Sequence, residues 1–140
     1  MGISANQRWL RAVLLFGILY AVVGITFGAL ANPSTSNQMR FTWRLAAWLA
    51  SAAAFAAHIW YEHSRLRNSP PTSALHVSVA VAIGAFVLAV AANVHELWTA
   101  SNYRTSLALA LVAWPALTAV PAFVVALAAA AVLKRTRRSL

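Results

Sequence analysis

The side chains that could carry chemistry in this sequence are few. The chain has 4 histidines, 2 acidic residues and no cysteine among its 140 residues. Without cysteine, disulfide bonds, thiol redox chemistry and cysteine-bound zinc or iron–sulfur centres are excluded. Any site must therefore be built from histidine, glutamate, arginine, amide and hydroxyl groups.

One run of such residues, His58-Ile59-Trp60-Tyr61-Glu62-His63, lies near the middle of the chain. Zinc hydrolases use His-Glu-x-x-His or His-x-x-Glu-His. Here His58 and His63 are five residues apart, about 140° around a helix, so they diverge. The run does not predict a zinc hydrolase. It predicts a hydrogen-bonded His58 near one membrane surface, with Glu62 and His63 among headgroups or in water.

A second use of histidine is haem ligation, which requires imidazoles from facing helices at similar depth. His58, near the end of one predicted helix, and His76, near the start of the next, meet that requirement. His95 lies about 28 Å from His76 along the helix axis and cannot join them. His58 and His76 are therefore a candidate cofactor site. The alternative is that both are interfacial histidines that ligate nothing.

A different polar group is predicted at the opposite side. If the helices that carry Arg44 and Glu96 are antiparallel neighbours, the two charges lie at similar depth. A charge at that depth is costly alone and usually finds a partner. We expect a cluster of Arg44, Asn93, His95 and Glu96. The alternative is that Glu96 extends into the headgroups beside Trp98.

The elements that must position these residues are apolar. Hydrophobic residues make up 61% of the chain and charged residues 9%, whereas soluble domains have about 25% charged residues. So few charges cannot cover the surface of a soluble protein of this size. We therefore predict that most of the surface is in contact with lipid.

Four apolar runs are each long enough to cross about 30 Å of hydrocarbon as a helix. They cover residues 9–31, 42–61, 75–98 and 105–133, and helix-breaking residues lie between them. The predicted fold class is all-α, an integral membrane bundle of four transmembrane helices in a single domain.

The basic residues predict the orientation, because cytoplasmic loops are enriched in Lys and Arg. With both termini inside, the cytoplasmic positions are Arg8, Arg11, Arg65, Arg67, Lys134, Arg135, Arg137 and Arg138, against Arg40, Arg44 and Arg104 outside. Basic residues at the edges of apolar runs favour contact with anionic lipid headgroups rather than with nucleic acid. We predict cytoplasmic N and C termini.

The first apolar run has a second interpretation. Arg8, Arg11 and the apolar stretch before Ala29-Leu30-Ala31 have the order of a secretory signal with a small-residue cleavage site. The stretch is long for such a signal, and Pro33 would hinder cleavage. We expect a retained helix; cleavage would leave three helices with the C terminus still inside.

Small residues follow one face of this first helix, at Gly17, Ala21, Gly24 and Gly28. Such a face lets helix backbones approach closely. We expect it to pack against a neighbouring helix of the same chain, with a homo-oligomer interface as the alternative. A weaker stripe of small residues in the third helix runs through Ser78, Ala82, Ala85 and Ala89.

The fourth helix contains Pro115 and Pro121. Each proline removes a backbone donor, so a kink or a broken segment is expected. A packing kink is the simpler interpretation. A broken helix would be typical of a transporter site, where freed carbonyls coordinate an ion.

No residue spacing indicates a nucleophile with its base, and no phosphate-binding loop is present. We therefore expect a non-enzymatic accessory subunit or scaffold, in a homo-oligomer or a larger membrane complex. The heavy use of Ala, and of Arg over Lys, indicates a bacterial genome of high GC content, so we expect a bacterial inner (plasma) membrane protein. The alternatives are a small oligomeric transporter or channel that uses Glu96, Arg44 and the fourth helix, and a haem- or quinone-binding electron carrier that uses His58 and His76.

Overall fold

The computed structural model describes residues 5–33, 36–98 and 104–136. It contains the helices α1 (Ala5–Ala31), α2 (Asn37–Tyr61), α3 (Pro70–Trp98) and α4 (Arg104–Thr136), with a short π-helical segment, η1 (Glu62–Leu66), directly after α2. The described part of the chain has no strand. The predicted all-α class is confirmed.

The helices begin before the apolar runs do. Ser36 caps α2, because its Oγ accepts a hydrogen bond from the Met39 backbone N–H at 3.1 Å. Pro70 and Pro71 open α3, at positions where a missing N–H costs nothing. A count of apolar residues misses such polar or proline-containing first turns.

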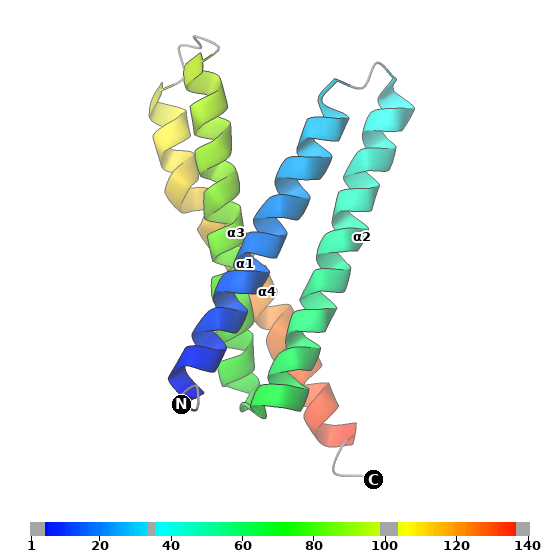
Figure 1. The fold of residues 1–140 in the computed structure, drawn as a ribbon, viewed down its shortest axis with the longest axis vertical. Helices are drawn as coiled ribbons and strands as arrows, with labels where there is room; N and C mark the ends of the chain where they lie inside the picture. The colour runs from blue at the N-terminus through cyan, green and yellow to red at the C-terminus, as the bar shows by residue number, and fades with distance from the viewer. Residues whose placement is uncertain (1–4, 34–35, 99–103, 137–140) are drawn as a thin grey trace.

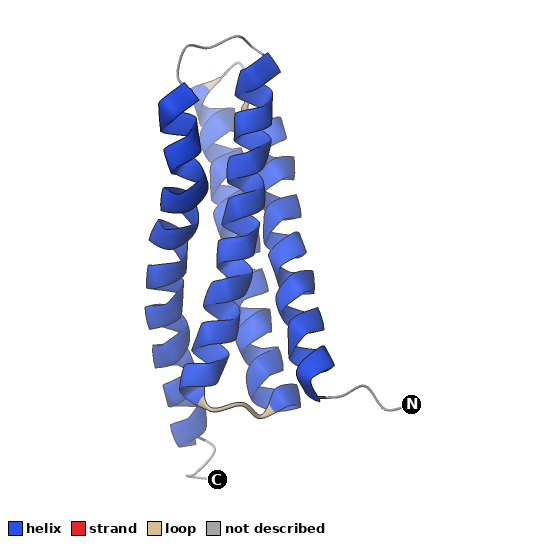
Figure 2. Ribbon diagram, turned by 90° about the vertical axis from the view of Figure 1, so that its left-hand side faces the viewer, coloured by secondary structure: helices blue, strands red, loops and turns tan. Residues whose placement is uncertain are grey.

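The helices form two antiparallel pairs, α1 with α2 and α3 with α4 (Figure 1). At one end, α1 begins, α2 ends, α3 begins and α4 ends, and the two pairs lie together there. We call this the closed end. At the other end the pairs diverge, and we call it the open end. Turned by 90°, the helices extend nearly parallel over the length of the molecule (Figure 2).

Small residues bring α1 and α3 together. A Cβ on Gly84 of α3 would lie 2.6 Å from the Tyr20 Cβ and 3.1 Å from the Gly17 carbonyl oxygen of α1. A Cβ on Gly17 would lie 2.9 Å from the Ile83 Cγ2, and one on Gly24 would lie 2.6 Å from the Leu88 Cδ1. Gly28 differs, because a Cβ there would meet no atom within 4 Å. The backbones therefore meet at Gly17 and Gly84.

The buried core lies toward the closed end. One cluster joins α1, α2 and α3 through Val13, Tyr20, Ala54 and Ala80. A second joins α2, α3 and α4 through Ile59, Ala74, Val77 and Ala126. The open end contributes no member to either cluster.

Three helices are long and apolar enough to cross a membrane: Gln7–Ala31, Pro70–His95 and Leu109–Thr136. Among the described residues α2 does not reach the same standard, and it carries Arg40, Arg44 and His58. The structure therefore supports three of the four predicted spans by length and composition, and the second, residues 42–61, corresponds to α2, the most polar of the helices.

The helix α4 continues through Pro115 and Pro121 without interruption. Between them, the Thr118 hydroxyl donates to the Trp114 and Pro115 carbonyl oxygens at 2.9 and 3.0 Å. Lipid-embedded helices tolerate proline in this way. A broken segment is not present, so α4 does not supply the unwound carbonyls that a transporter ion site would use.

Candidate functional site

A buried carboxylate marks the closed end. Glu62, the first residue of η1, has none of its surface exposed. The backbone N–H groups of Arg67 and Asn68 both donate to the Glu62 carbonyl oxygen, which closes the helix end and turns the chain toward α3. A single π-helical turn of this kind is frequent at functional sites. The turn places the carboxylate inside the molecule instead of in the solvent.

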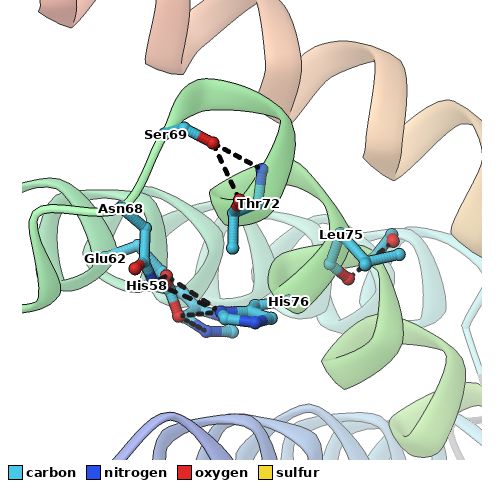
Figure 3. Close-up of polar contacts among 8 residues, drawn as sticks. His58, Glu62, Asn68, Ser69, Thr72, Leu75 and His76 are labelled. Carbon is cyan, nitrogen blue, oxygen red and sulfur yellow. Dashed lines mark hydrogen bonds and ion pairs between the residues drawn. The ribbon is translucent and has the colours of Figure 1, made fainter. Parts of the chain in front are cut away.

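Two side chains from the next segment bind this carboxylate (Figure 3). The Asn68 Nδ2 donates to the Glu62 Oε2 at 2.7 Å. The His76 Nδ1 lies 3.1 Å from both carboxylate oxygens. The Asn68 Nδ2 and the His76 Nδ1 are themselves 3.5 Å apart. Glu62 therefore ties the end of α2 to the start of α3.

His58 completes the group without a hydrogen bond. It lies one helical turn before Glu62 and is fully buried. Its Nε2 is 3.8 Å from the Glu62 Oε1, which is within ion-pair range but too long for a hydrogen bond. Neither ring nitrogen has a hydrogen-bond partner. Buried polar atoms without a hydrogen-bond partner are uncommon in native proteins.

Aromatic side chains of α1 cover both imidazoles. Trp9 stacks on His76 with ring centroids 4.8 Å apart, and Phe16 stacks on His58 with centroids 4.0 Å apart. The rings are nearly parallel in both pairs. The two aromatic rings therefore cover His58 and His76 on the side that faces α1.

The arrangement of His58, Glu62 and His76 suits the sharing of a proton. The carboxylate accepts, an imidazole can donate or accept according to its protonation, and the Asn68 amide donates. Burial strengthens such interactions and makes an unpaired charge costly. No group of three or more metal-binding side chains in the described ranges has an arrangement that could hold a metal ion.

The structure brings the predicted cofactor residues, His58 and His76, to the same carboxylate. The Glu62 side chain lies between them, and a ring of α1 covers a face of each imidazole. This geometry favours a direct histidine–carboxylate interaction over a porphyrin inserted between the two rings.

The predicted polar group of Arg44, Asn93, His95 and Glu96 lies at the open end. Arg44 lines a cavity of about 510 Å³ between α1 and α2, together with Gly24, Gly28 and Trp48. The Asn93 Nδ2 donates to the Ala89 carbonyl oxygen of its own helix at 2.7 Å. His95 is exposed, and the Glu96 side chain lies outside the described residues. The pairing of Arg44 with Glu96 stays a prediction.

Sequence reasoning missed the central role of Glu62. Its position four residues after His58 put both on one helix face. Its position directly after the end of the apolar run nevertheless suggested headgroups or water. Asn68, within a turn-forming segment, gave no signal, because its role depends on how η1 directs the chain. Gly84 was missed for a similar reason, since a single glycine in an Ala-rich helix makes no pattern.

Comparison with known protein families, with characterised proteins and with solved structures finds no match to this chain. Function must therefore be argued from the site and from the distribution of polar and apolar side chains.

Proposed function

We propose that this chain is an integral membrane protein of four transmembrane helices, with both termini in the cytoplasm, that serves as a non-enzymatic accessory subunit or scaffold. A bacterial inner membrane fits its composition. The Glu62 cluster then holds the two helix pairs together near the cytoplasmic surface.

The observation that carries the membrane assignment is the distribution of side chains. Large apolar side chains point outward along every helix: Leu15 is 67% exposed, Trp48 77%, Val87 38% and Leu117 70%. The fully buried side chains include His58 and Glu62. In water this arrangement would be very unfavourable, because apolar surface is exposed while polar groups are desolvated. Lipid around the bundle removes the first cost.

The packing of α1 supports a retained first helix. Val13 and Tyr20 belong to the core, and Trp9 and Phe16 cover the two imidazoles. Cleavage after Ala31 would expose His58 and remove the partner of Gly84. Intact-mass measurement of the purified protein tests this, and we expect a mass that includes α1.

Orientation can be tested in the cysteine-free chain. Single cysteines at Ser36, Ser69 and Ser139 can be labelled in intact cells with a membrane-impermeant maleimide. We expect labelling at Ser36 only, because α1 and α2 meet on the outer side in this topology. Labelling of the Ser69 variant from outside would overturn the orientation.

The subunit or scaffold role predicts association. Purification in mild detergent should give a stoichiometric complex with a heterologous membrane protein, whereas a homo-oligomer of this chain alone would favour a transporter. Because the loops are short, the helix surfaces are open to such contacts. The cavity beside Gly28, where an added Cβ meets no atom within 4 Å, is one such surface. A strictly monomeric, monodisperse protein from the native membrane would contradict this role.

The Glu62 cluster favours a second candidate, a small oligomeric transporter or channel that handles protons. Ionisable residues inside membrane proteins are commonly proton sites. Proton uptake into vesicles that contain the protein, lost in Glu62→Gln, would support it. The transporter hypothesis based on Glu96 and Arg44 instead predicts loss in Glu96→Gln.

Haem or quinone binding by His58 and His76 makes a separate prediction. Purified protein with haem would show a Soret band that His76→Ala removes. A colourless protein that also yields no quinone on solvent extraction would exclude this carrier role.

A further inference from the structure

We propose that a cavity at the closed end binds the phosphate group of an anionic ligand. The cavity has a volume of about 420 Å³ and lies between the turn that joins η1 to α3 and the last turns of α4. Its polar lining comes from His63, Arg67, Asn68, Ser69, Ser73 and Lys134.

The lining is positively charged. Arg67 and Lys134 contribute cations from opposite sides, and no acidic residue lines the cavity. The nearest acid along the chain, Glu62, is already bound to Asn68 and His76. In the described ranges neither Arg67 nor Lys134 forms an ion pair. Two unpaired cations on one concave surface favour an anion, and a guanidinium with an ammonium suits phosphate in particular.

A serine hydroxyl adds a hydrogen-bond donor to the cavity lining. Ser73 is only 2% exposed and lines the cavity. Its backbone N–H donates to the Ser69 carbonyl oxygen at 2.9 Å. Its hydroxyl has no hydrogen bond with any described residue. A phosphate oxygen in the cavity would accept its hydrogen bond.

The backbone of Arg67 fits this role. Arg67 has a φ of 52°, the left-handed region that non-glycine residues rarely adopt. This conformation ends η1 and brings Arg67 and Asn68 to the mouth of the cavity. Such conformations cost about 1–2 kcal/mol in L-residues, so glycine would be less strained than arginine at this position.

The first amides of α3 do not complete the site. Pro70 and Pro71 have no N–H, and the Thr72 N–H donates to the Ser69 Oγ at 3.4 Å. Side chains must therefore hold the anion. If the proposed membrane topology holds, the cavity lies at the depth of the cytoplasmic headgroups, and the phosphate belongs to an anionic lipid. A soluble phosphate compound would use the same contacts.

The test uses the full chain purified in dodecyl maltoside, with thermal unfolding as the measurement. One series adds phosphatidylglycerol, with phosphatidylcholine as its control. The other adds inorganic phosphate, with sodium chloride at equal ionic strength. The cavity variant is Arg67→Asn with Lys134→Gln, because asparagine tolerates a left-handed backbone. The matched control is Arg8→Gln with Arg65→Gln, which removes the same charge from exposed positions outside this cavity.

We expect a concentration-dependent rise in Tm for the unaltered chain and the control variant. The cavity variant should need about tenfold more ligand for each lost contact. An effect of phosphatidylglycerol alone identifies a lipid, and an effect of inorganic phosphate identifies a soluble ligand even if membrane insertion is wrong.

Ser73→Ala gives a second measurement, because it leaves the charge unchanged. It should weaken binding without lowering Tm in the absence of ligand. No rise in Tm with either additive, or an equal loss of binding in the cavity and control variants, would overturn the proposal.

Discussion

The closed and open ends of the molecule are built from the same four helices but are stabilised differently. At the closed end, hydrogen bonds and an ion pair around Glu62 join α2 to α3, and both apolar clusters lie nearby. At the open end, the helix pairs diverge (Figure 1) and Gly28 meets no atom within 4 Å. The contacts of Glu62 therefore tie the two pairs together at the closed end.

The difference has a physical reason. In lipid, contact between apolar side chains contributes little free energy to helix association, because the lipid tails they would otherwise contact are equally apolar. Close backbone packing and polar contacts decide which helices associate. Glu62 provides the polar contacts at the closed end, and Gly17 with Gly84 provides the close backbone packing midway along α1 and α3. At the open end, Gly28 of α1 has no such close neighbour.

Loss of Glu62 should have the largest effect on the closed end. Glu62→Ala leaves the partly buried His76 and Asn68 without their shared acceptor, and we expect a loss of about 3 kcal/mol in the free energy of unfolding. Chemical unfolding in detergent measures it. Glu62→Gln keeps an acceptor and should cost less. His63→Ala, at the adjacent position, is the control, and an equal effect of both alanine variants would contradict the role of Glu62.

Gly84→Leu should break the contact between α1 and α3. The new side chain meets the Tyr20 Cβ and the Gly17 backbone, which cannot move aside. We expect a cost of about 1–3 kcal/mol, as overpacking causes elsewhere. The matched change, Gly28→Leu, meets open space and should leave the stability of the isolated chain unchanged. If Gly28→Leu instead dissociates a complex, the Gly28 face is the interface between proteins.

A smaller effect is expected for Gly24→Leu. The added side chain meets the end of Leu88, which can change rotamer, so the cost should fall near the low end of about 1–3 kcal/mol. Val22→Leu is the control, because Val22 is 52% exposed. Equal Tm values for the two variants would mean that Gly24 faces lipid.

The smallest effect tests the open end. If Arg44 pairs with Glu96, Arg44→Gln and Glu96→Gln should each destabilise the protein by less than about 1 kcal/mol, and the double variant should cost no more than one of them. Pairing requires the helix pairs to approach each other at this end. Additive effects would show that the two residues do not interact and that the pairs stay apart.

Much of the architecture could be predicted from residue types. The apolar runs indicated the number of helices, and the ends at Ala31, Tyr61 and Trp98 agree with the structure. The starts of α2 and α3 could not be found by the same count, because Ser36 and the paired prolines begin helices without being apolar. The sequence also identified His58 and His76 as facing residues, since both lie near helix ends at the same side.

The carboxylate between them depended on the tertiary structure. Glu62 and Asn68 come together because η1 continues past Tyr61 and then reverses at Arg67, and neither the π-helical turn nor a positive φ at arginine has a pattern in one sequence. The partners of Gly17 and Phe16 likewise depend on which helix lies beside α1. Periodicity determined which residues share a helix face, because that is local geometry. The choice between competing apolar neighbours was decided only by close backbone contact and buried polar contacts between helices.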